Sequence, residues 1–351
     1  MYTLGIDLHK KSSVWILIDE QRTELWKEDV LCHPDHITTA VKNIPVPHSK
    51  IQVAIEPVAG WRWVSGILEE SGMDVHIAHP RKIQLIAKST KKTDTEDART
   101  LANLLCAGYF PEAHKSGDDI YQLRLLLRER NFIIQQRTSI KNQIHGIATT
   151  QGLHEIRSGN PLFKKGKEGI LKGNNFVLKQ LHLLVEDFEK RVVPFDERLQ
   201  EALVQYPTAR LLMTFPGVGM ITALTIIAEV DDFTRFPNGK KLASFAGLVP
   251  RQRSSGDVVR YGAITHAGSA ALRTVLVETA MRIRASNAPE LYAFVQRLAP
   301  ICGAKKARVA LARKTLCIMW KMVTTGTPYT PHIPPSSCTT NMSDLDTAAG
   351  T

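Results

Sequence analysis

Hydrophobic positions in residues 1–110 form short runs that alternate with segments of helical periodicity. Short apolar runs bounded by turn residues predict strands, and apolar positions spaced three and four residues apart predict helices. The pattern predicts strands at 3–8, 14–19, 24–31, 51–55 and 73–78, and helices at 35–43, 61–71, 80–88 and 93–107. Three strands followed by alternating helices and strands are typical of a mixed α/β sheet with helices on its faces.

The pattern changes after residue 112. Two long helical patterns at 120–147 and 175–203 enclose a Gly-, Lys- and Asn-rich basic loop at 152–173. A helical hairpin or coiled-coil arm fits this pattern, and so does an ordinary helical subdomain. Residues 206–325 are mostly helical in pattern, and the Pro-, Ser- and Thr-rich end is typical of a disordered tail. We therefore expect four parts: 1–112, 113–205, 206–325 and 326–351.

Charge is distributed unevenly along the chain. The formal net charge is +11, yet residues 233–320 alone carry 15 Lys and Arg against 3 Asp and Glu. A field of one sign on this scale is typical of a protein that binds phosphate groups. A solvated basic surface without a specific partner is the alternative.

Other features of the composition indicate in which cellular compartment the protein works. The chain has no run of about 18 apolar residues, so we expect no membrane span. Charged residues interrupt the N-terminus before any apolar stretch develops, which argues against a signal peptide. The five cysteines are scattered without a CxxC pair, which argues against a zinc site or a disulfide framework and favours a cytoplasmic protein.

A carboxylate lies inside the first apolar run, where it is costly to bury. Leu4, Ile6 and Leu8 share one face of that strand, so Asp7 points to the other face. Glu56 directly follows the apolar run 51–55. In this order of elements the first and fourth strands lie side by side, and we expect Asp7 and Glu56 to approach each other at the surface of the sheet.

Two more acids begin the helix in "KTDTEDARTLANLL". Thr93 and Glu96 form a T-x-x-E capping box that fixes the helix start. Asp94 and Asp97 are then i and i+3 on one face, and that face continues through apolar residues. We expect both acids on the buried side of the helix. Any one of these acids alone could be a cap or a surface group.

Clustered carboxylates repel each other unless a cation joins them. Oxygen ligands suit Mg²⁺ or Mn²⁺, and two such ions about 4 Å apart can hold the attacking and leaving oxygens of a phosphodiester. The arrangement resembles the RNase H-like fold of RuvC-type nucleases, in which an Asp on the first strand, a Glu on the fourth and acids on a late helix bind two metal ions. Asp7, Glu56, Asp94 and Asp97 match that pattern.

The segment "TFPGVGMITALTIIAEV" resembles a helix-hairpin-helix motif. Gly217 and Gly219 would allow a tight turn whose backbone N–H groups approach phosphate at the start of the next helix. A plain glycine-rich junction between two helices fits the same residues.

Downstream, "FAGLVPRQRSSGDVVRYGAITHAGSAALR" places a pair of serines, Ser254 and Ser255, among arginines. The arginines are Arg251, Arg253, Arg260 and Arg273. A serine beside a metal site could attack phosphorus while the arginines neutralise the charge that develops on the phosphate. An ordinary turn also fits "RSSG", and no adjacent base is visible in the sequence.

These stretches together resemble the DEDD-type transposases of bacterial insertion sequences, the family described as bridge-RNA-guided recombinases. The matching segments are "GIDLHK", "AIEPVAGW", "KTDTEDA", "FPGVGMITA", "AGLVPRQRSSG" and "GAITHAGSAALR". They occur in the order found in the family and extend over nearly all of the chain up to residue 285.

The resemblance implies a RuvC-like N-terminal domain that binds two Mg²⁺ or Mn²⁺ ions through Asp7, Glu56, Asp94 and Asp97. It also implies a C-terminal transposase domain whose serine forms a covalent phosphoserine link to DNA. Ser255 matches that serine, and Ser254 is the reserve. The acids and the serine would act on the same scissile bond.

The resemblance further implies the partners. They are donor and target DNA, a non-coding bridge RNA that pairs with both, and other copies of the chain in a tetramer assembled through the helical arm. Base pairing would then supply sequence choice, and the basic domain would hold nucleic-acid backbones. The protein would work in the bacterial cytoplasm and join the nucleoid when bound to DNA.

Two other functions stay open on the residues alone. A metal-dependent RuvC-like endonuclease would need the four acids but no serine, and would leave hydrolysed ends without a protein–DNA adduct. A non-enzymatic nucleic-acid-binding protein would need neither the acids nor the serine.

Overall fold

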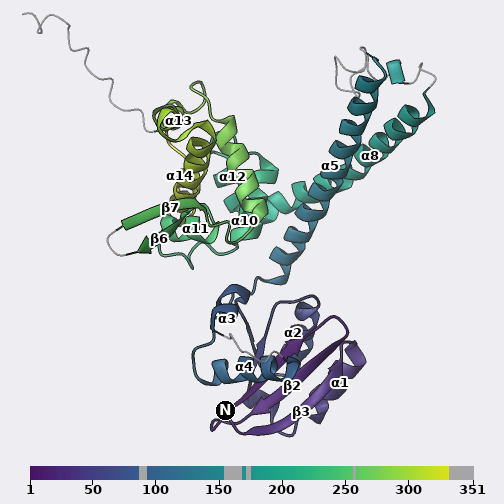
Figure 1. The fold of residues 1–351 in the computed structure, drawn as a ribbon, viewed down its shortest axis with the longest axis vertical. Helices are drawn as coiled ribbons and strands as arrows, with labels where there is room; N and C mark the ends of the chain where they lie inside the picture. The colour runs from purple at the N-terminus through teal and green to yellow at the C-terminus, as the bar shows by residue number, and fades with distance from the viewer. Residues whose placement is uncertain (87–92, 154–167, 171–174, 256–257, 332–351) are drawn as a thin grey trace, which may run out of the picture. The chain divides into compact units, whose positions relative to one another are not determined.

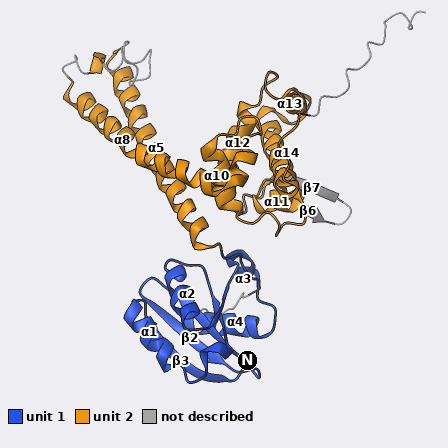
Figure 2. Ribbon diagram, turned by 180° about the vertical axis from the view of Figure 1, so that it is seen from behind, with its two compact units in different colours: residues 1–115 blue, residues 116–351 orange. Residues whose placement is uncertain are grey.

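A computed structural model of the chain describes residues 1–86, 93–153, 168–170, 175–255 and 258–331, with the side chains of 253–261 outside the description. The chain divides into two compact units, residues 1–115 and residues 116–351 (Figures 1 and 2). Most of the basic loop at 152–173 and nearly all of the tail beyond residue 326 lie outside the described residues.

The first unit is built on a five-stranded sheet with the order β3-β2-β1-β4-β5. Strands β1 to β3 pair in antiparallel fashion, whereas β4 lies parallel to β1 and β5 parallel to β4. The predicted mixed sheet and the predicted contact between its first and fourth strands are therefore confirmed. The elements are β1 Tyr2–Leu8, β2 Ser12–Ile18, β3 Glu24–Leu31, α1 Pro34–Asn43, a 3₁₀ turn His48–Lys50, β4 Ile51–Ile55, α2 Trp61–Glu70, β5 Asp74–Ile77, α3 Pro80–Ile86 and α4 Asp94–Cys106.

Helices cover both faces of this sheet, which explains why its central strands are apolar on both sides. Leu4, Ile6 and Leu8 of β1 pack into a core with residues of α1 and α2. On the opposite face, Ala98 and Ala102 of α4 pack against β2. Asp7 belongs to the face that α4 covers, because it alternates with the three apolar residues along the strand.

Helix α1 begins at Pro34, one residue before the predicted start. Its cap residue is His33, which makes no capping hydrogen bond through its side chain. Pro34 occupies the first turn, where its fixed φ suits a helix and its missing N–H costs nothing. Asp35 lies in the first turn beyond the cap position.

The second unit begins with two long helices that pack side by side, α5 Asp118–Thr150 and α8 Phe176–Gln205 (Figure 1). Their contacts show that they run antiparallel: Arg130 pairs with Asp196 at 2.6 Å, and Lys141 pairs with Glu189 at 3.3 Å. At 33 residues, α5 is about 50 Å long. The two predicted helical patterns are thus two helices packed together.

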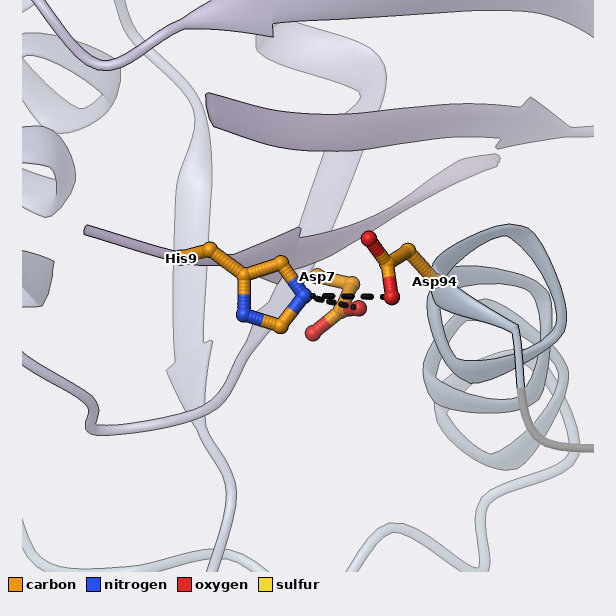
Figure 3. Close-up of side chains that lie close together, drawn as sticks. All are labelled: Asp7, His9 and Asp94. Atoms are coloured by element: carbon orange, nitrogen blue, oxygen red, sulfur yellow. Dashed lines mark ion pairs between the residues drawn. The ribbon is translucent and has the colours of Figure 1, made fainter. Parts of the chain in front are cut away.

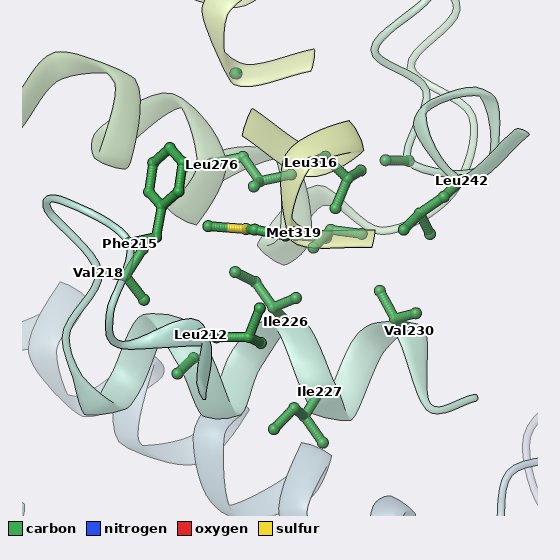
Figure 4. Packing of buried hydrophobic residues seen from close by; sticks show 14 of the residues in the cluster. Leu212, Phe215, Val218, Ile226, Ile227, Val230, Leu242, Leu276, Leu316 and Met319 are labelled. Atoms are coloured by element: carbon green, nitrogen blue, oxygen red, sulfur yellow. The ribbon is translucent and has the colours of Figure 1, made fainter. Parts of the chain in front are cut away.

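The remaining helices enclose the main apolar core of the second unit. Nine consecutive residues at the end of α10, from Thr222 to Val230, are buried, as expected of a helix that is surrounded on all sides. Phe215, Leu276 and Met319 pack around it (Figure 4). The elements are α9 Pro207–Leu212, α10 Met220–Val230, α11 Gly239–Phe245, β6 Pro250–Ser255, β7 Val258–Ile264, α12 Ala270–Arg282, α13 Pro289–Cys302 and α14 Ala304–Thr325.

Strands β6 and β7 form a separate two-stranded antiparallel sheet. Among the helices that the structure describes, none is both long and apolar enough to cross a membrane.

Candidate active site

The candidate acids come from three places in the first unit: strand β1, the residue after β4, and the start of α4. Asp7 on β1 is the most buried of them, with 8% of its surface exposed. It shares its face of the strand with Gly5. A Cβ atom at Gly5 would lie 2.0 Å from the backbone oxygen of Ala98 and 2.9 Å from the Cβ of Ala102. Glycine is therefore what lets α4 rest directly on β1 and bring its first turn toward Asp7.

The start of α4 is held by its cap, as the sequence predicts. The side chain of Thr93 accepts a hydrogen bond from the backbone N–H of Glu96 at 3.2 Å. The carboxylate of Glu96 does not complete the reciprocal half of the capping box; it pairs with Arg99, which also pairs with Glu24 at 2.6 Å. The cap thus fixes where α4 begins, and an ion-pair network ties its outer side to β3.

The two acids of α4 differ in their exposure. The side chain of Asp94 is 59% exposed, so the expectation that both acids are buried is wrong for Asp94. The reason is that Asp94 is the first residue of α4, one turn before the helix meets the sheet at Ala98. Its carboxylate nevertheless faces Asp7 (Figure 3). Asp97 is half-buried.

Asp7 is the acid of this group whose pKa is clearly shifted. Burial raises the pKa of Asp7 above its ordinary value; His9 opposes this increase, whereas Asp97 and Asp94 add to it. The Oδ2 atom of Asp7 is buried and accepts no well-aligned hydrogen bond from the described residues. A buried carboxylate among like charges is costly without a cation nearby.

His9 is the residue that sequence reasoning missed. Its Nε2 atom lies 3.2 Å from Asp7 Oδ2 and 3.3 Å from Asp94 Oδ1 (Figure 3). The signal was present in "DLH", because residues i and i+2 of an extended segment point to the same side.

Glu56 is placed by the pairing of the strands. Ile6 of β1 pairs with Ile55 of β4 in parallel register, and Asp7 and Glu56 are the residues that follow them. Neighbouring strands lie about 4.8 Å apart, so the backbones of these two acids are adjacent. Glu56 is half-buried.

This group of donors fits a divalent cation. Asp7, His9 and Asp94 each offer one ligand atom, and these atoms lie within 4.8 Å of one another. Hard divalent ions prefer oxygen ligands, and the buried Oδ2 of Asp7 has no hydrogen-bond partner of good geometry among the described residues. The structure therefore brings Asp7 and Asp94 together directly, and Asp97 is close enough to raise the pKa of Asp7. Glu56 is placed beside Asp7 only by the backbone register of β1 and β4, and neither Glu56 nor Asp97 belongs to the group of three ligand atoms.

The serines predicted as reactive lie in the hairpin of the second unit. Ser254 pairs with Val259 and Ser255 pairs with Val258, so both belong to the last part of β6. Their side chains, and those of Arg253 and Arg260, lie outside the described part of the structure.

The base of this hairpin is tightly built. Gly247 and Gly268 both have positive φ. A Cβ atom at Gly247 would lie 2.1 Å from the backbone oxygen of Ala267, and one at Gly268 would lie 2.0 Å from that of Phe245, the last residue of α11. Arg273, which we expected to face phosphate, donates from Nη1 to the carbonyl oxygens of Ala246, Ala267 and Gly268 at 2.9–3.2 Å. Arg251 is exposed, and its Nη2 lies 3.5 Å from the carbonyl oxygen of Thr265.

The two glycines of "FPGVG" play different parts in the turn between α9 and α10. Gly217 has a φ of +82°, and a Cβ there would lie 3.1 Å from that of Arg282 on α12. Gly219 precedes α10, is exposed, and has no atom within 4 Å of the place where a Cβ would lie. Packing thus requires a glycine at 217, whereas the space around 219 is open.

Comparisons with known proteins cover both units. A family model for DEDD transposases of the IS110 type, described as "Transposase", matches residues 4–150. A second, described as "Transposase IS116/IS110/IS902 family", matches residues 209–296. The first match contains all four candidate acids, and the second contains the glycine turn, the serine hairpin and Arg273.

Curated relatives agree with the two family models. The transposase for insertion sequence element IS1111A of Coxiella burnetii is 25% identical over 268 residues, covering 74% of this chain and 73% of that protein. The transposase for IS1328 of Yersinia enterocolitica is 25% identical over 287 residues, covering 79% and 85%. The pilin gene-inverting protein of Moraxella bovis is 25% identical over 268 residues, covering 74% and 75%. On these matches, which follow the order of the motifs in the sequence, the chain belongs to the DEDD transposases of the IS110 family.

Proposed function

We propose that this transposase cuts and rejoins DNA strands at the ends of an insertion sequence, using a metal site in its first unit and a serine in its second. The metal site would consist of Asp7, Glu56, Asp94 and Asp97 on an RNase H-like, RuvC-like scaffold. The observation that carries the proposal is the buried Asp7, whose Oδ2 has no well-aligned hydrogen bond within the described part of the chain and lies beside the acids of α4.

Two Mg²⁺ or Mn²⁺ ions at this site would stabilise charge on the attacking and leaving oxygens of a phosphodiester. The chain's own contribution is to hold the acids in place before the ions arrive. The parallel pairing of β1 with β4 supports a position of Glu56 beside Asp7, and the close packing of α4 on Gly5 supports the approach of Asp94 and Asp97. Such preorganisation means that little rearrangement is needed at the moment of reaction.

The serine would act as the nucleophile. Oγ of Ser255, with Ser254 as the reserve, would attack phosphorus; the new Oγ–P bond forms as the P–O bond to the neighbouring nucleotide breaks, and the leaving oxygen takes up a proton. A hydroxyl of the partner strand would later attack the same phosphorus and release the serine. Arg251, Arg253 and Arg260, which belong to the same hairpin, would neutralise charge on the phosphate. Arg273 would act by bracing the base of the hairpin.

The partners of this reaction would be donor DNA, target DNA and a bridge RNA that pairs with both, held by a tetramer of the chain. The charge surplus of residues 233–320 supports the nucleic-acid partners, because backbone phosphates are bound mainly by Lys and Arg. The open space at Gly219, at the start of α10, suits the approach of a phosphate to backbone N–H groups. The α5–α8 pair would mediate assembly.

A denaturing gel of labelled DNA tests the serine role. Wild-type protein with element-end DNA, target DNA and the flanking RNA should give a band shifted by covalently bound protein. Ser255→Ala should abolish this band, whereas Ser244→Ala, an exposed serine on α11, should retain it.

The outcomes separate the mechanisms. Loss of the band in Ser254→Ala alone would move the nucleophile to the reserve serine. If both variants still form the adduct and join strands, the serine role is wrong. Hydrolysed ends with no adduct in any protein would instead identify a metal-dependent endonuclease without a serine nucleophile.

A further inference from the structure

His9 holds a position that the four acids do not explain. Its Nε2 atom lies between two carboxylates that come from different elements, 3.2 Å from Asp7 Oδ2 and 3.3 Å from Asp94 Oδ1 (Figure 3). The ring is half-exposed, whereas Asp7 is almost completely buried. His9 therefore lies at the mouth of the acid cluster, with one nitrogen directed into it.

The spacing of these three atoms resembles a coordination shell. Six oxygen or nitrogen ligands about 2.1 Å from an Mg²⁺- or Mn²⁺-sized ion lie roughly 3.0 Å apart when adjacent and 4.2 Å apart when opposite. The contacts of Nε2 are close to the adjacent spacing, and all three atoms lie within 4.8 Å of one another. One ion can therefore be shared by the three residues with little movement.

A second histidine of the same unit shows that this arrangement is not a general result of placing histidine beside acids. His76 on β5 also contacts two carboxylates, Asp74 at 3.1 Å and Glu112 at 3.0 Å. It does so through opposite ring nitrogens, Nε2 for Asp74 and Nδ1 for Glu112. A single ion cannot take the place of both contacts, so His76 is an ordinary bridge between two acids.

The backbone around His9 supports a fixed position for its side chain. Its N–H donates to the carbonyl oxygen of Ser12 at 2.9 Å, which closes the turn between β1 and β2. Its carbonyl oxygen accepts from the thiol of Cys32 at 3.1 Å. The main chain is thus bound on both sides, and the ring is the part that extends toward the acids.

We propose that His9 is a further protein ligand of the DEDD metal site, where its Nε2 shares one ion with Asp7 and Asp94. This inference rests on the proposed metal function. Imidazole nitrogen is a softer donor than carboxylate oxygen, and Mg²⁺ accepts it poorly, whereas Mn²⁺ and later transition ions accept it well. His9 accordingly biases the site toward Mn²⁺ over Mg²⁺.

Electron spin-echo spectroscopy of Mn²⁺ bound to the full chain tests this assignment, because a directly bonded imidazole gives a ¹⁴N coupling that carboxylates cannot give. The wild-type protein should show the coupling, and His9→Gln should lose it. His76→Gln is the matched control and should keep it. Titration should show that His9→Gln weakens Mn²⁺ binding about tenfold or more while changing Mg²⁺ binding much less.

The outcomes distinguish this inference from the metal function on which it rests. If the wild-type protein binds Mn²⁺ without ¹⁴N coupling, His9 is not a ligand and the acid site stands. If the coupling persists in His9→Gln, or disappears in His76→Gln, the assignment is also wrong. If the wild-type protein binds no Mn²⁺ at millimolar concentration, while Asp7→Asn behaves identically, both the inference and the proposed metal site fail. Thermal unfolding of each variant shows whether it is folded. We expect His9→Gln to fold normally, because half of the His9 side chain is exposed.

Discussion

The acid cluster of the first unit and the serine hairpin of the second are held in place by different means. Asp7 and Asp94 lie on elements that pack through the core: β1 is the central strand of its sheet, and α4 rests on it at Gly5. Ser254 and Ser255 lie on a two-stranded sheet whose firm contacts are at its base. Packing in the first unit reaches Asp7 itself, whereas the described packing of the hairpin lies in the segments at its base.

Glycine makes both arrangements possible, with different consequences. Gly5 removes a side chain so that a helix can approach a strand, and that approach sets the distance between two acids. Gly247 and Gly268 let the backbone segments at the base of the hairpin approach closely, which anchors strands β6 and β7 at that end. Two strands alone provide little stability in water. The difference indicates that packing within the first unit positions Asp7 and Asp94 of the proposed metal site, whereas the described contacts of the hairpin position the base of its strands.

The largest expected effect comes from removing the charge at the centre of the acid cluster. Asp7→Asn should lower strand joining by about a thousandfold or more and abolish the stabilisation that Mn²⁺ gives the wild-type protein, because a neutral amide cannot replace the buried carboxylate. Strand-joining assays and melting curves with and without Mn²⁺ measure the two effects. Asp35→Asn, an exposed acid in the first turn of α1, is the control. Near-normal joining by Asp7→Asn would contradict the proposed metal site.

Gly5→Ala tests the packing that positions the acids. Its Cβ would lie 2.0 Å from the backbone oxygen of Ala98, so α4 must move away from β1. We expect a loss of about 3 kcal/mol in the free energy of unfolding of the first unit, together with weaker Mn²⁺ binding. Gly66→Ala, in α2, is the matched control, since a Cβ there has no atom within 4 Å and alanine favours a helix. Denaturant unfolding and metal titration of both variants provide the comparison. Unchanged Mn²⁺ binding in Gly5→Ala would show that the packing of α4 on Gly5 does not position the acids.

Gly247→Ala should impair the serine reaction and leave metal binding intact, the opposite of what we expect for metal binding in Gly5→Ala. The residue has a positive φ, and its Cβ would lie 2.1 Å from the carbonyl oxygen of Ala267. Disturbing the base of the hairpin should reduce adduct formation about tenfold or more, while Mn²⁺ binding by the first unit stays at the wild-type level. Gly262→Ala on β7, whose Cβ would lie 3.8 Å from Arg251, should leave both unchanged. Parallel loss of metal binding in Gly247→Ala would show that the two sites are not separately built.

Much of this organisation could be predicted from the sequence, because it depends on local patterns. Apolar runs identified the strands of the mixed sheet, and the T-x-x-E signal located the start of α4 at Thr93. Strand order then placed the backbones of Asp7 and Glu56 side by side without knowledge of any distance. The exposure of Asp94 was predicted wrongly, since periodicity shows which face a residue occupies but not where along the helix contact with the sheet begins.

The roles that could not be predicted depend on contacts between distant segments. His9 looks like a turn residue until Asp94, far along the chain, is placed beside it. Gly5 lies in an apolar strand where glycine has no evident local reason, and only the approach of α4 supplies one. Arg273 looked like a phosphate ligand, but three carbonyl oxygens from two loops converge on it. Alternation along the strand places His9 on the same side as Asp7, but none of the contacts with distant segments leaves a periodic signal in the sequence.

The smallest expected effect is on the thermal stability of Asp7→Asn in the absence of metal. It shows whether Asp7 stabilises the fold or is kept for binding a cation. Because burial raises the pKa of Asp7, with Asp97 and Asp94 adding to the rise and His9 opposing it, the folded chain holds this proton more tightly than the unfolded chain. Stability therefore falls as the pH rises from the unfolded pKa of Asp7 through its higher folded pKa, and the deficit persists at neutral pH. Asp7→Asn, which cannot ionise, should melt about 2–4 °C higher than the wild-type protein in metal-free buffer at pH 7. The difference should vanish below the unfolded pKa of Asp7 and reverse when Mn²⁺ is added. A variant that is less stable than the wild-type protein at neutral pH without metal would show that Asp7 is held there for the fold and not for a cation.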